Sequence, residues 1–91
     1  MPRVYNWRDG RAPPNAVNIM RPGPYGNRFH IGEHGNRATV LRRFECEQLP
    51  EIDLRPLIGR DLVCCCKPLP CHGDILLRAA AALRQELRAL E

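Results

Sequence analysis

The 91-residue sequence has one lysine, few aromatic residues and no long hydrophobic run. No stretch of about 18 or more apolar residues occurs, so no segment has the length and composition of a membrane-spanning helix. The N-terminal sequence MPRVYNWRDGR lacks the apolar core of a signal peptide, and we therefore expect a cytoplasmic protein. The length predicts a single domain over residues 1–91 with a thin core.

Basic residues are almost all arginine, because Lys67 is the only lysine among 14. Residues 1–43 hold eight arginines against Asp9 and Glu33, whereas residues 44–91 hold six basic and eight acidic residues. Guanidinium groups bind phosphate and carboxylate groups in two-point contacts, which favours an anionic partner such as a nucleotide or nucleic acid. A solvated surface encoded by a GC-rich genome explains the same composition, and charge balance says little about fold.

Residue patterns predict an α/β fold with the order strand, strand, helix, strand, helix. The three strand-like segments are RVYNW (3–7), AVNIM (16–20) and DLVCCC (61–66). The first helix is expected to start at a cap, Asn36 or Thr39, and to end near Leu49. The second starts near Cys71 and continues to the C-terminus. Because the first helix connects strands two and three, we expect a small three-stranded, partly parallel sheet that resembles half of a Rossmann fold.

The second helix carries an apolar stripe with spacings of four and three residues. The stripe consists of Leu76, Ala80, Leu83, Leu87 and Leu90. This period predicts a face that packs against the core. The helix is too short to form an independent coiled coil, so we favour core packing over a dimer seam.

Two unusual loops follow the second and third strands, Arg21–Gly32 and Lys67–Asp74. Ligands of α/β proteins bind beyond the carboxyl ends of the strands, so we expect both loops to line one site. The first loop is long for a domain of this size, which is typical of functional loops. We expect Tyr25, Phe29 and Ile31 to pin it to the core.

Cysteines are concentrated around the third strand. Cys64, Cys65, Cys66 and Cys71 fall within eight residues, and His72 follows the last. Three consecutive cysteines and an odd total do not fit a disulfide framework, and cytoplasmic thiols stay reduced. Metal binding, thiol reactivity and plain burial remain as explanations.

Alternation along a strand places Cys64 and Cys66 on one face and Cys65 on the other. Together, Cys64, Cys66, Cys71 and His72 offer three sulfurs and one nitrogen, which zinc accepts in a tetrahedron. The spacing is uncommon for zinc, and the adjacent side chains of Cys71 and His72 diverge. Zinc is therefore the alternative, and the leading interpretation has no cofactor.

Cys71, His72 and Asp74 lie at the expected start of the last helix. Free backbone N–H groups and the helix dipole favour an anion there and lower the pKa of a thiol. In this interpretation Cys71 is a nucleophile, and His72 or Asp74 transfers protons. In the structural alternative the cysteines fill the core, His72 satisfies a loop carbonyl, and Asp74 favours the helix dipole.

The loop after strand two offers candidate ligand-binding residues. Arg21 suits an acidic group, and Asn27 suits an amide or a base edge. Gly23 and Gly26 allow close approach of the backbone to a ligand, and Tyr25 can stack on a base. Cys64 and Cys66 complete the expected ligand-binding set. In the structural alternative, the glycines set turns and Tyr25 fills the core.

Two segments resemble a family of small bacterial and phage proteins, the domain of unknown function 4326. Residues 17–32, VNIMRPGPYGNRFHIG, are similar to the family segment Arg-Pro-x-x-aromatic-Gly-Asn-Pro-Phe. Residues 58–77, IGRDLVCCCKPLPCHGDILL, are similar to its segment Gly-x-x-Leu-x-Cys-x-Cys-x-Pro-x-x-Cys-His-Gly-Asp. The matching positions are Arg21, Gly26, Asn27, Phe29, Cys64, Cys66, Cys71, His72, Gly73 and Asp74.

The resemblance implies a compact α/β domain, often phage-encoded, with no established activity. Arg28 replaces the usual proline, which loosens the loop. Cys65 replaces a usual aromatic residue, which implies that Cys65 faces the core.

The leading functional hypothesis is a polar pocket that binds or modifies a nucleotide, a nucleoside or a related nucleic-acid ligand. The alternative is a non-enzymatic, zinc-stabilised binding module that contacts nucleic acid or a host protein through the basic N-terminal half. A phage protein that blocks a host factor is a third possibility. The sequence does not decide whether a reaction is catalysed, and it predicts no membrane partner.

Overall fold

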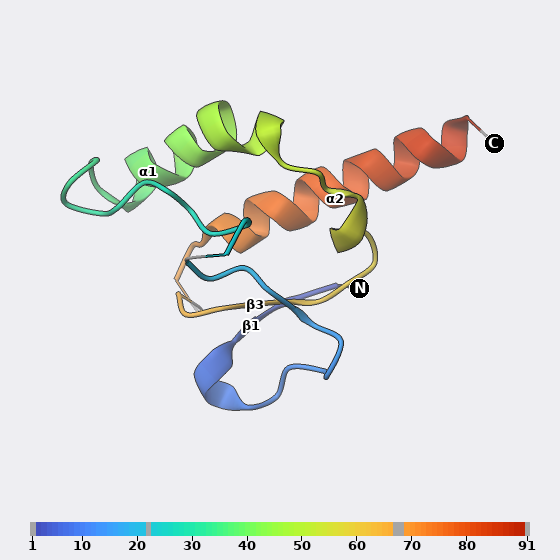
Figure 1. Cartoon of the computed structure of the whole chain (residues 1–91), viewed down its shortest axis with the longest axis horizontal. Helices are drawn as coiled ribbons and strands as arrows, with labels where there is room; N and C mark the ends of the chain where they lie inside the picture. Colours follow the sequence, from blue (N-terminus) through green and yellow to red (C-terminus); the bar gives the residue numbers. More distant parts are fainter. Residues whose placement is uncertain (1, 22, 67–68, 91) are drawn as a thin grey trace.

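A computed structural model describes residues 2–21, 23–66 and 69–90 of the chain (Figure 1). Its strands are β1 (Val4–Asn6), β2 (Val17–Asn18) and β3 (Leu62–Cys64), and its α-helices are α1 (Arg37–Arg43) and α2 (His72–Ala89). Shorter helical turns are η1 (Trp7–Asp9), η2 (Phe44–Gln48), η3 (Leu49–Glu51) and η4 (Arg55–Leu57). The predicted α/β class and order of the main elements are confirmed.

The sheet has the order β1-β3-β2, with β3 in the centre. Leu62 of β3 aligns with Val4 of β1 on one side and with Val17 of β2 on the other, and both pairings are parallel. The parallel pairing expected for the second and third strands is thus present, and the first strand is parallel as well. Because the strands point the same way, their carboxyl ends meet at one edge of the sheet.

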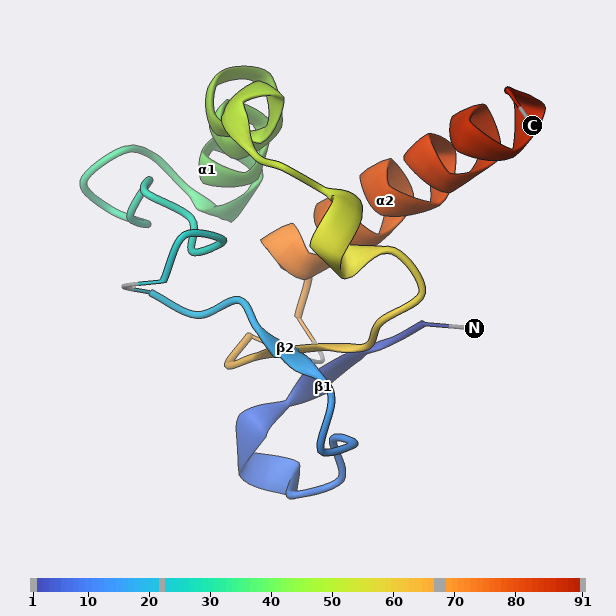
Figure 2. The ribbon, with the colours of Figure 1, turned by 45° about the vertical axis from the view of Figure 1, so that its right-hand side comes forward.

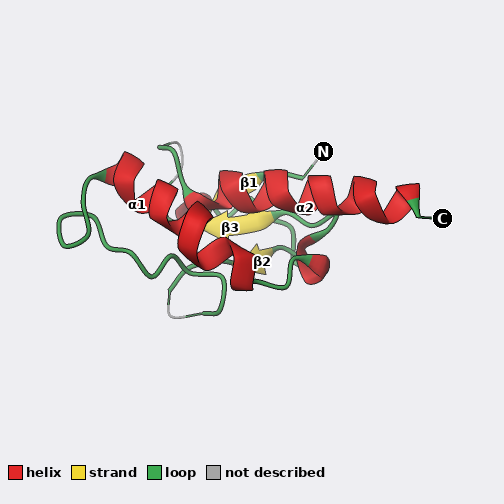
Figure 3. Ribbon diagram, turned by 90° about the horizontal axis from the view of Figure 1, so that it is seen from above, coloured by secondary structure: helices red, strands yellow, loops and turns green. Residues whose placement is uncertain are grey.

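Both α-helices lie on the same face of the sheet, whereas the connection from η1 to β2 lies on the other side (Figures 2 and 3). The core therefore forms in the single layer between the sheet and the helices. Its buried members are Ile19, Phe44, Leu57, Leu62, Cys64, Cys71, Ile75, Leu76 and Ala80.

This one-sided cover overturns the expectation for Cys65. Cys65 is exposed, and Cys64 is the strand cysteine in the core. The predicted alternation is correct, but Cys64 lies on the face that the helices cover. Cys65 follows the last residue of β3 and is exposed, so it does not belong to the core.

The start of α1 is capped as the sequence predicts. The side chain of Asn36 accepts a hydrogen bond of 2.9 Å from the backbone N–H of Thr39. Beyond Arg43 the chain continues through η2 and η3 to Glu51 instead of ending near Leu49. Val40, Phe44 and Gln48 are buried along the inner side of this segment.

The second helix begins at the predicted residue, since Cys71 is its N-cap. Only the first part of its apolar stripe is core. Leu76 and Ala80 are buried, whereas Leu87 and Leu90 are exposed, because the C-terminal half of α2 extends past the sheet (Figure 1). No helix of the described residues is long and apolar enough to cross a membrane.

Candidate functional site

A cavity of about 260 Å³ lies at the carboxyl edge of the sheet. The loop after β2, the segment after β3 and the starts of α1 and α2 all contribute to it, so the expected convergence of the two loops is found. Its polar and thiol lining consists of Arg21, Asn27, His30, Arg37, Cys64, Cys65, Cys66, Cys71 and His72. Lys67, at the start of the second loop, lies outside the described residues.

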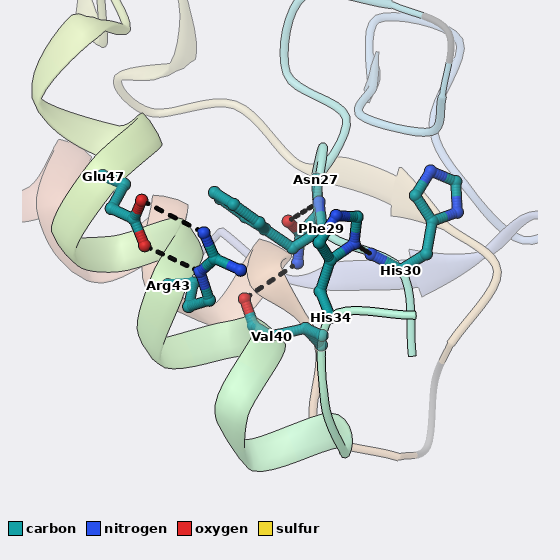
Figure 4. Close-up of polar contacts among 7 residues, drawn as sticks. All are labelled: Asn27, Phe29, His30, His34, Val40, Arg43 and Glu47. Carbon is teal, nitrogen blue, oxygen red and sulfur yellow. Dashed lines mark hydrogen bonds and ion pairs between the residues drawn. The ribbon is translucent and has the colours of Figure 1, made fainter. Parts of the chain in front are cut away.

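Asn27 anchors the first loop to α1 (Figure 4). Its Nδ2 donates to the carbonyl of Val40 at 3.3 Å, and its Oδ1 accepts from the backbone N–H of Phe29 at 2.9 Å. The side chain is buried, so both ends of the amide already have protein partners. These contacts explain why the position suits asparagine, and its reading of a ligand stays a prediction.

Phe29 holds the same loop by a stacked arrangement of side chains. The guanidinium carbon of Arg43 lies 4.3 Å from the Phe29 ring centroid, and the His34 ring meets Phe29 edge-on (Figure 4). Arg43 also donates to Glu47, with 2.8 Å between Nε and Oε2. Phe29 and Tyr25 pack against the core as predicted, but Ile31 is 55% exposed, because the chain turns back towards α1 over residues 31–34.

Gly26 has a structural reason to be glycine. A β-carbon at this position would lie 2.8–2.9 Å from atoms of Arg21, two of them backbone atoms. The missing side chain therefore lets the loop close on itself, and the approach of this backbone to a ligand stays a prediction. The carbonyl of Gly26 accepts a hydrogen bond of 2.6 Å from Gln48, whose Oε1 accepts from the N–H of Arg28 at 2.9 Å.

Three thiols form a cluster at one end of the cavity. The Sγ atoms of Cys64 and Cys71 lie 2.9 Å apart, and those of Cys64, Cys66 and Cys71 all lie within 4.8 Å of one another. Cys64 ends the central strand and Cys71 caps α2, so two regular elements position these sulfurs. The set is one that a thiophilic metal ion accepts.

The structure contradicts the expected low pKa of Cys71. The N–H of Gly73 donates to its sulfur at 3.1 Å, which lowers the pKa as the helix start predicts. The contact with Cys64 and burial outweigh this effect and raise the pKa of Cys71. Burial also raises the pKa of Cys66, against a hydrogen bond from Arg37 that lowers it. Both thiols are therefore protonated at neutral pH in the absence of a metal.

His72 is buried and held by backbone and core groups. Its Nε2–H donates to the carbonyl of Ile19 at 2.9 Å, and its ring meets Phe44 edge-on, with 5.2 Å between centroids. Burial lowers the pKa of His72, so the ring is neutral near pH 7. Its role matches the structural alternative, in which the histidine satisfies a loop carbonyl.

Asp74 belongs to a capping box at the start of α2. Its Oδ2 accepts from the N–H of Cys71 at 3.3 Å. Asp74 therefore stabilises the start of α2, as its position in the first turn of the predicted helix suggested. The catalytic roles of Cys71, His72 and Asp74 stay predictions.

Two arginines line the cavity from different elements. Arg21 Nη1 donates to the carbonyl of Asn27 at 3.1 Å and lies 3.2 Å from His30 Nδ1. Arg37 Nη1 donates to the carbonyl of Pro70 at 2.9 Å, which joins the start of α1 to the start of α2. Sequence reasoning missed Arg37. The sequence offered one indication of Arg37 as a site residue: it directly follows the helix cap Asn36. The start of that helix lies at the carboxyl edge of the sheet, where the cavity is.

Gln48 was also missed as a residue that supports the site. It lies one turn beyond Phe44 on the inner side of the segment, where a polar residue requires a buried partner. A polar residue on the inner side of a helix could thus have marked Gln48 as a supporting residue. Its partners, Gly26 and Arg28, could not be identified from the sequence, because they lie about twenty residues away in the chain.

The chain matches one protein family and one phage protein. The family model described as "Domain of unknown function (DUF4326)" matches residues 3–82. An Enterobacteria phage T4 protein described as "Uncharacterized 12.4 kDa protein in nrdA-td intergenic region" is 38% identical over 69 residues. That match covers 66% of this chain and 62% of the phage protein, so the chain spans about three fifths of its relative.

No solved structure matches the chain. The family match includes every residue that lines the cavity, and the relative is a phage protein. The chain belongs to the domain of unknown function 4326 family.

Proposed function

We propose that the cavity binds a small nucleotide-like anion, with Arg21 and Arg37 holding its anionic group. The observation that carries the proposal is that two guanidinium groups from separate elements line one cavity. Each guanidinium has five N–H donors in a planar fork. Arg21 and Arg37 each donate to a described backbone carbonyl through Nη1, and Arg37 also donates to the thiol of Cys66. These contacts leave further N–H groups of both side chains for phosphate or carboxylate oxygens.

The remaining walls suit a flat, partly apolar group. Phe29, Val40 and Leu41 line the cavity beside the arginines. Its volume of about 260 Å³ lies just below the range for small-molecule sites, about 300–1,000 Å³. A nucleoside or mononucleotide is therefore a better match than a dinucleotide cofactor.

Any reaction on such a ligand would have to use the cysteine end of the cavity. His72 is neutral and its Nε2–H is bound to Ile19, so it is poorly placed to donate a proton to a ligand. The expected modification of a base or nucleotide therefore has less support than binding, and ligand binding is the function proposed here.

The test is calorimetric titration and thermal shift with nucleosides, nucleoside monophosphates and inorganic phosphate. We expect at least one mononucleotide to bind and to raise the melting temperature, and Arg21→Gln to weaken its binding about tenfold or more. Arg28→Gln is the matched control, because Arg28 belongs to the same loop but does not line the cavity. Failure of all of these ligands to bind, or equal losses in the two variants, would overturn the proposal.

A second candidate function is binding of single-stranded nucleic acid, favoured by the surface around η1. Trp7 is 51% exposed, and the guanidinium of Arg8 lies 5.5 Å from its ring centroid. An exposed aromatic ring beside arginines is the usual platform for unpaired bases. Trp7 is the only tryptophan, so quenching of its fluorescence by an oligonucleotide tests the idea directly. Absence of quenching at low salt would exclude it.

A further inference from the structure

The three clustered thiols have nearly the spacing of a metal site. Zinc–sulfur bonds of about 2.3 Å place the sulfurs of a tetrahedron about 3.8 Å apart. The sulfurs of Cys64 and Cys71 lie 2.9 Å apart, and no two sulfurs of the group are more than 4.8 Å apart. Movements of about 1 Å or less in the side chains would bring all three sulfurs to equal distances from one ion.

Each of the three sulfurs also receives a hydrogen bond. The N–H of Cys66 donates to the sulfur of Cys64 at 3.4 Å, and the N–H of Gly73 donates to the sulfur of Cys71 at 3.1 Å. The side chain of Arg37 donates to the thiol of Cys66. A neutral thiol is a weak acceptor, whereas metal-bound thiolates are commonly surrounded by such donors. Donors aimed at all three sulfurs therefore suit thiolates bound to a metal ion, although they do not suffice to deprotonate the thiols without one.

The surrounding charge matches the same chemistry. Three thiolates around a divalent ion carry a net charge of about −1. Arg37 lies beside Cys66, and Cys71 caps the N-terminal end of α2, where the helix dipole stabilises negative charge. Soft sulfur ligands select zinc over magnesium or manganese.

The fourth ligand expected from the sequence does not join the group. His72 Nδ1 lies 3.9 Å from the sulfur of Cys71, but His72 is not part of the described set whose ligand atoms all lie within 4.8 Å of one another. Its Nε2 bond to Ile19 and its contact with Phe44 hold the ring in place. All three thiols line the cavity, as His72 does, but only the thiols form the close group.

We infer that Cys64, Cys66 and Cys71 bind one zinc ion through three thiolates, with the fourth coordination position open to the cavity. Three protein ligands and an open position are the arrangement of catalytic zinc sites, whereas structural sites have four protein ligands. The open position would accept water or an anionic atom of a ligand held by Arg21 and Arg37. Zinc binding does not require the proposed nucleotide, so it is measured without one.

The first experiment titrates the reduced full-length chain with Zn²⁺ and with Co²⁺ as a spectroscopic substitute. We expect one ion per chain and the thiolate charge-transfer and visible bands of tetrahedral cobalt. Zinc should protect three thiols from a thiol reagent and leave the exposed Cys46 and Cys65 reactive. A reduced wild-type chain that binds no stoichiometric metal and whose thiols gain no protection overturns the inference.

Matched cysteine variants identify the ligands. Cys66→Ser should weaken metal binding by about 100-fold or more, and it is preferred because Cys66 lies outside β3 and does not cap α2. Cys46→Ser is the control for the loss of an exposed thiol, and Cys65→Ser tests the immediate neighbour. Equal weakening in Cys65→Ser and Cys66→Ser would contradict the assigned set. Circular dichroism confirms that each variant is folded.

The open position needs a separate measurement. Addition of azide or inorganic phosphate to the cobalt form should shift its visible bands, because an outside ligand replaces water. His72→Gln, if folded, should bind cobalt with nearly unchanged affinity. Bands that do not respond to azide, together with X-ray absorption showing three sulfurs and one imidazole nitrogen, would show instead that His72 is the fourth ligand.

Discussion

The side-chain amide of Gln48 donates a buried hydrogen bond of 2.6 Å to the backbone carbonyl of Gly26. The same amide accepts from the N–H of Arg28, so one side chain satisfies two backbone groups of the loop after β2. The cavity wall thus depends on a residue that has no contact with the cavity itself.

Replacement of Gln48 by alanine should destabilise the protein strongly. Two backbone groups lose their buried partner, at about 1–3 kcal/mol each, so we expect a loss of about 2–4 kcal/mol in the free energy of unfolding. Chemical denaturation measures the loss. Gln85→Ala is the control, because Gln85 is exposed on α2. A Gln48→Ala variant as stable as the control would contradict the assigned role.

Gly26→Ala should be more harmful than Gly23→Ala. A β-carbon at Gly26 meets Arg21 backbone atoms at 2.9 Å, whereas one at Gly23 meets only the carbonyl oxygen of Met20, at 3.2 Å. Overpacking of this kind costs about 1–3 kcal/mol, and we expect Gly26→Ala near the upper end. The melting temperatures of the two variants, measured together, give the comparison. The reverse order of stability would show that the loop does not close on Arg21 as described.

The ion pair between Arg43 and Glu47 should make a small, pH-dependent contribution to stability. The hydrogen bond from Arg43 lowers the pKa of Glu47 below its ordinary value of 4.5. A carboxyl group with a lowered folded-state pKa stabilises the fold above the unfolded-state pKa, and this stabilisation is lost as pH falls through the folded-state pKa. Glu47→Gln should therefore be slightly less stable than wild type at neutral pH and equally stable in strong acid.

Thermal melts of the wild-type chain and of Glu47→Gln, from neutral pH down to strong acid, test whether the stability difference between them shrinks as pH falls. Glu45→Gln is the matched control, since Glu45 is exposed on the same turn and forms no ion pair with a described residue. A difference between wild type and Glu47→Gln that grows as pH falls would refute the assignment, because the sign would be opposite.

Asp74→Ala should weaken the start of α2. The variant loses the bond from the Asp74 carboxylate to the N–H of Cys71, and loss of such a capping interaction costs about 1 kcal/mol. For a domain of this size we expect the melting temperature to fall by about 4–8 °C. Glu86→Ala, an exposed position on the same helix, is the control. If Asp74→Ala binds a mononucleotide less tightly but keeps its stability, Asp74 acts in the site and the capping role is minor.

Local sequence signals predicted the starts of both α-helices. Asn36 caps α1 through its own side chain, and Cys71 lies directly before α2, after prolines that cannot continue a strand. Such boundaries depend on bonds between residues two or three positions apart, which a single sequence displays. The stripe from Leu76 to Leu90 identified the helix but not its burial, because the extent of the sheet beneath it is not a local property.

The family, the α/β order, the helix caps and the alternation of Cys64, Cys65 and Cys66 could all be predicted from the sequence. These follow from residue type and short spacings. The packing of the layers was needed to show that Cys64 is buried and Cys65 is exposed. It was also needed to show that the side chains of Asn27, Gln48 and His72 form hydrogen bonds with backbone groups far away in the chain. Burial, hydrogen-bond partners and sulfur–sulfur distances depend on how the layers pack, and no local pattern encodes that packing.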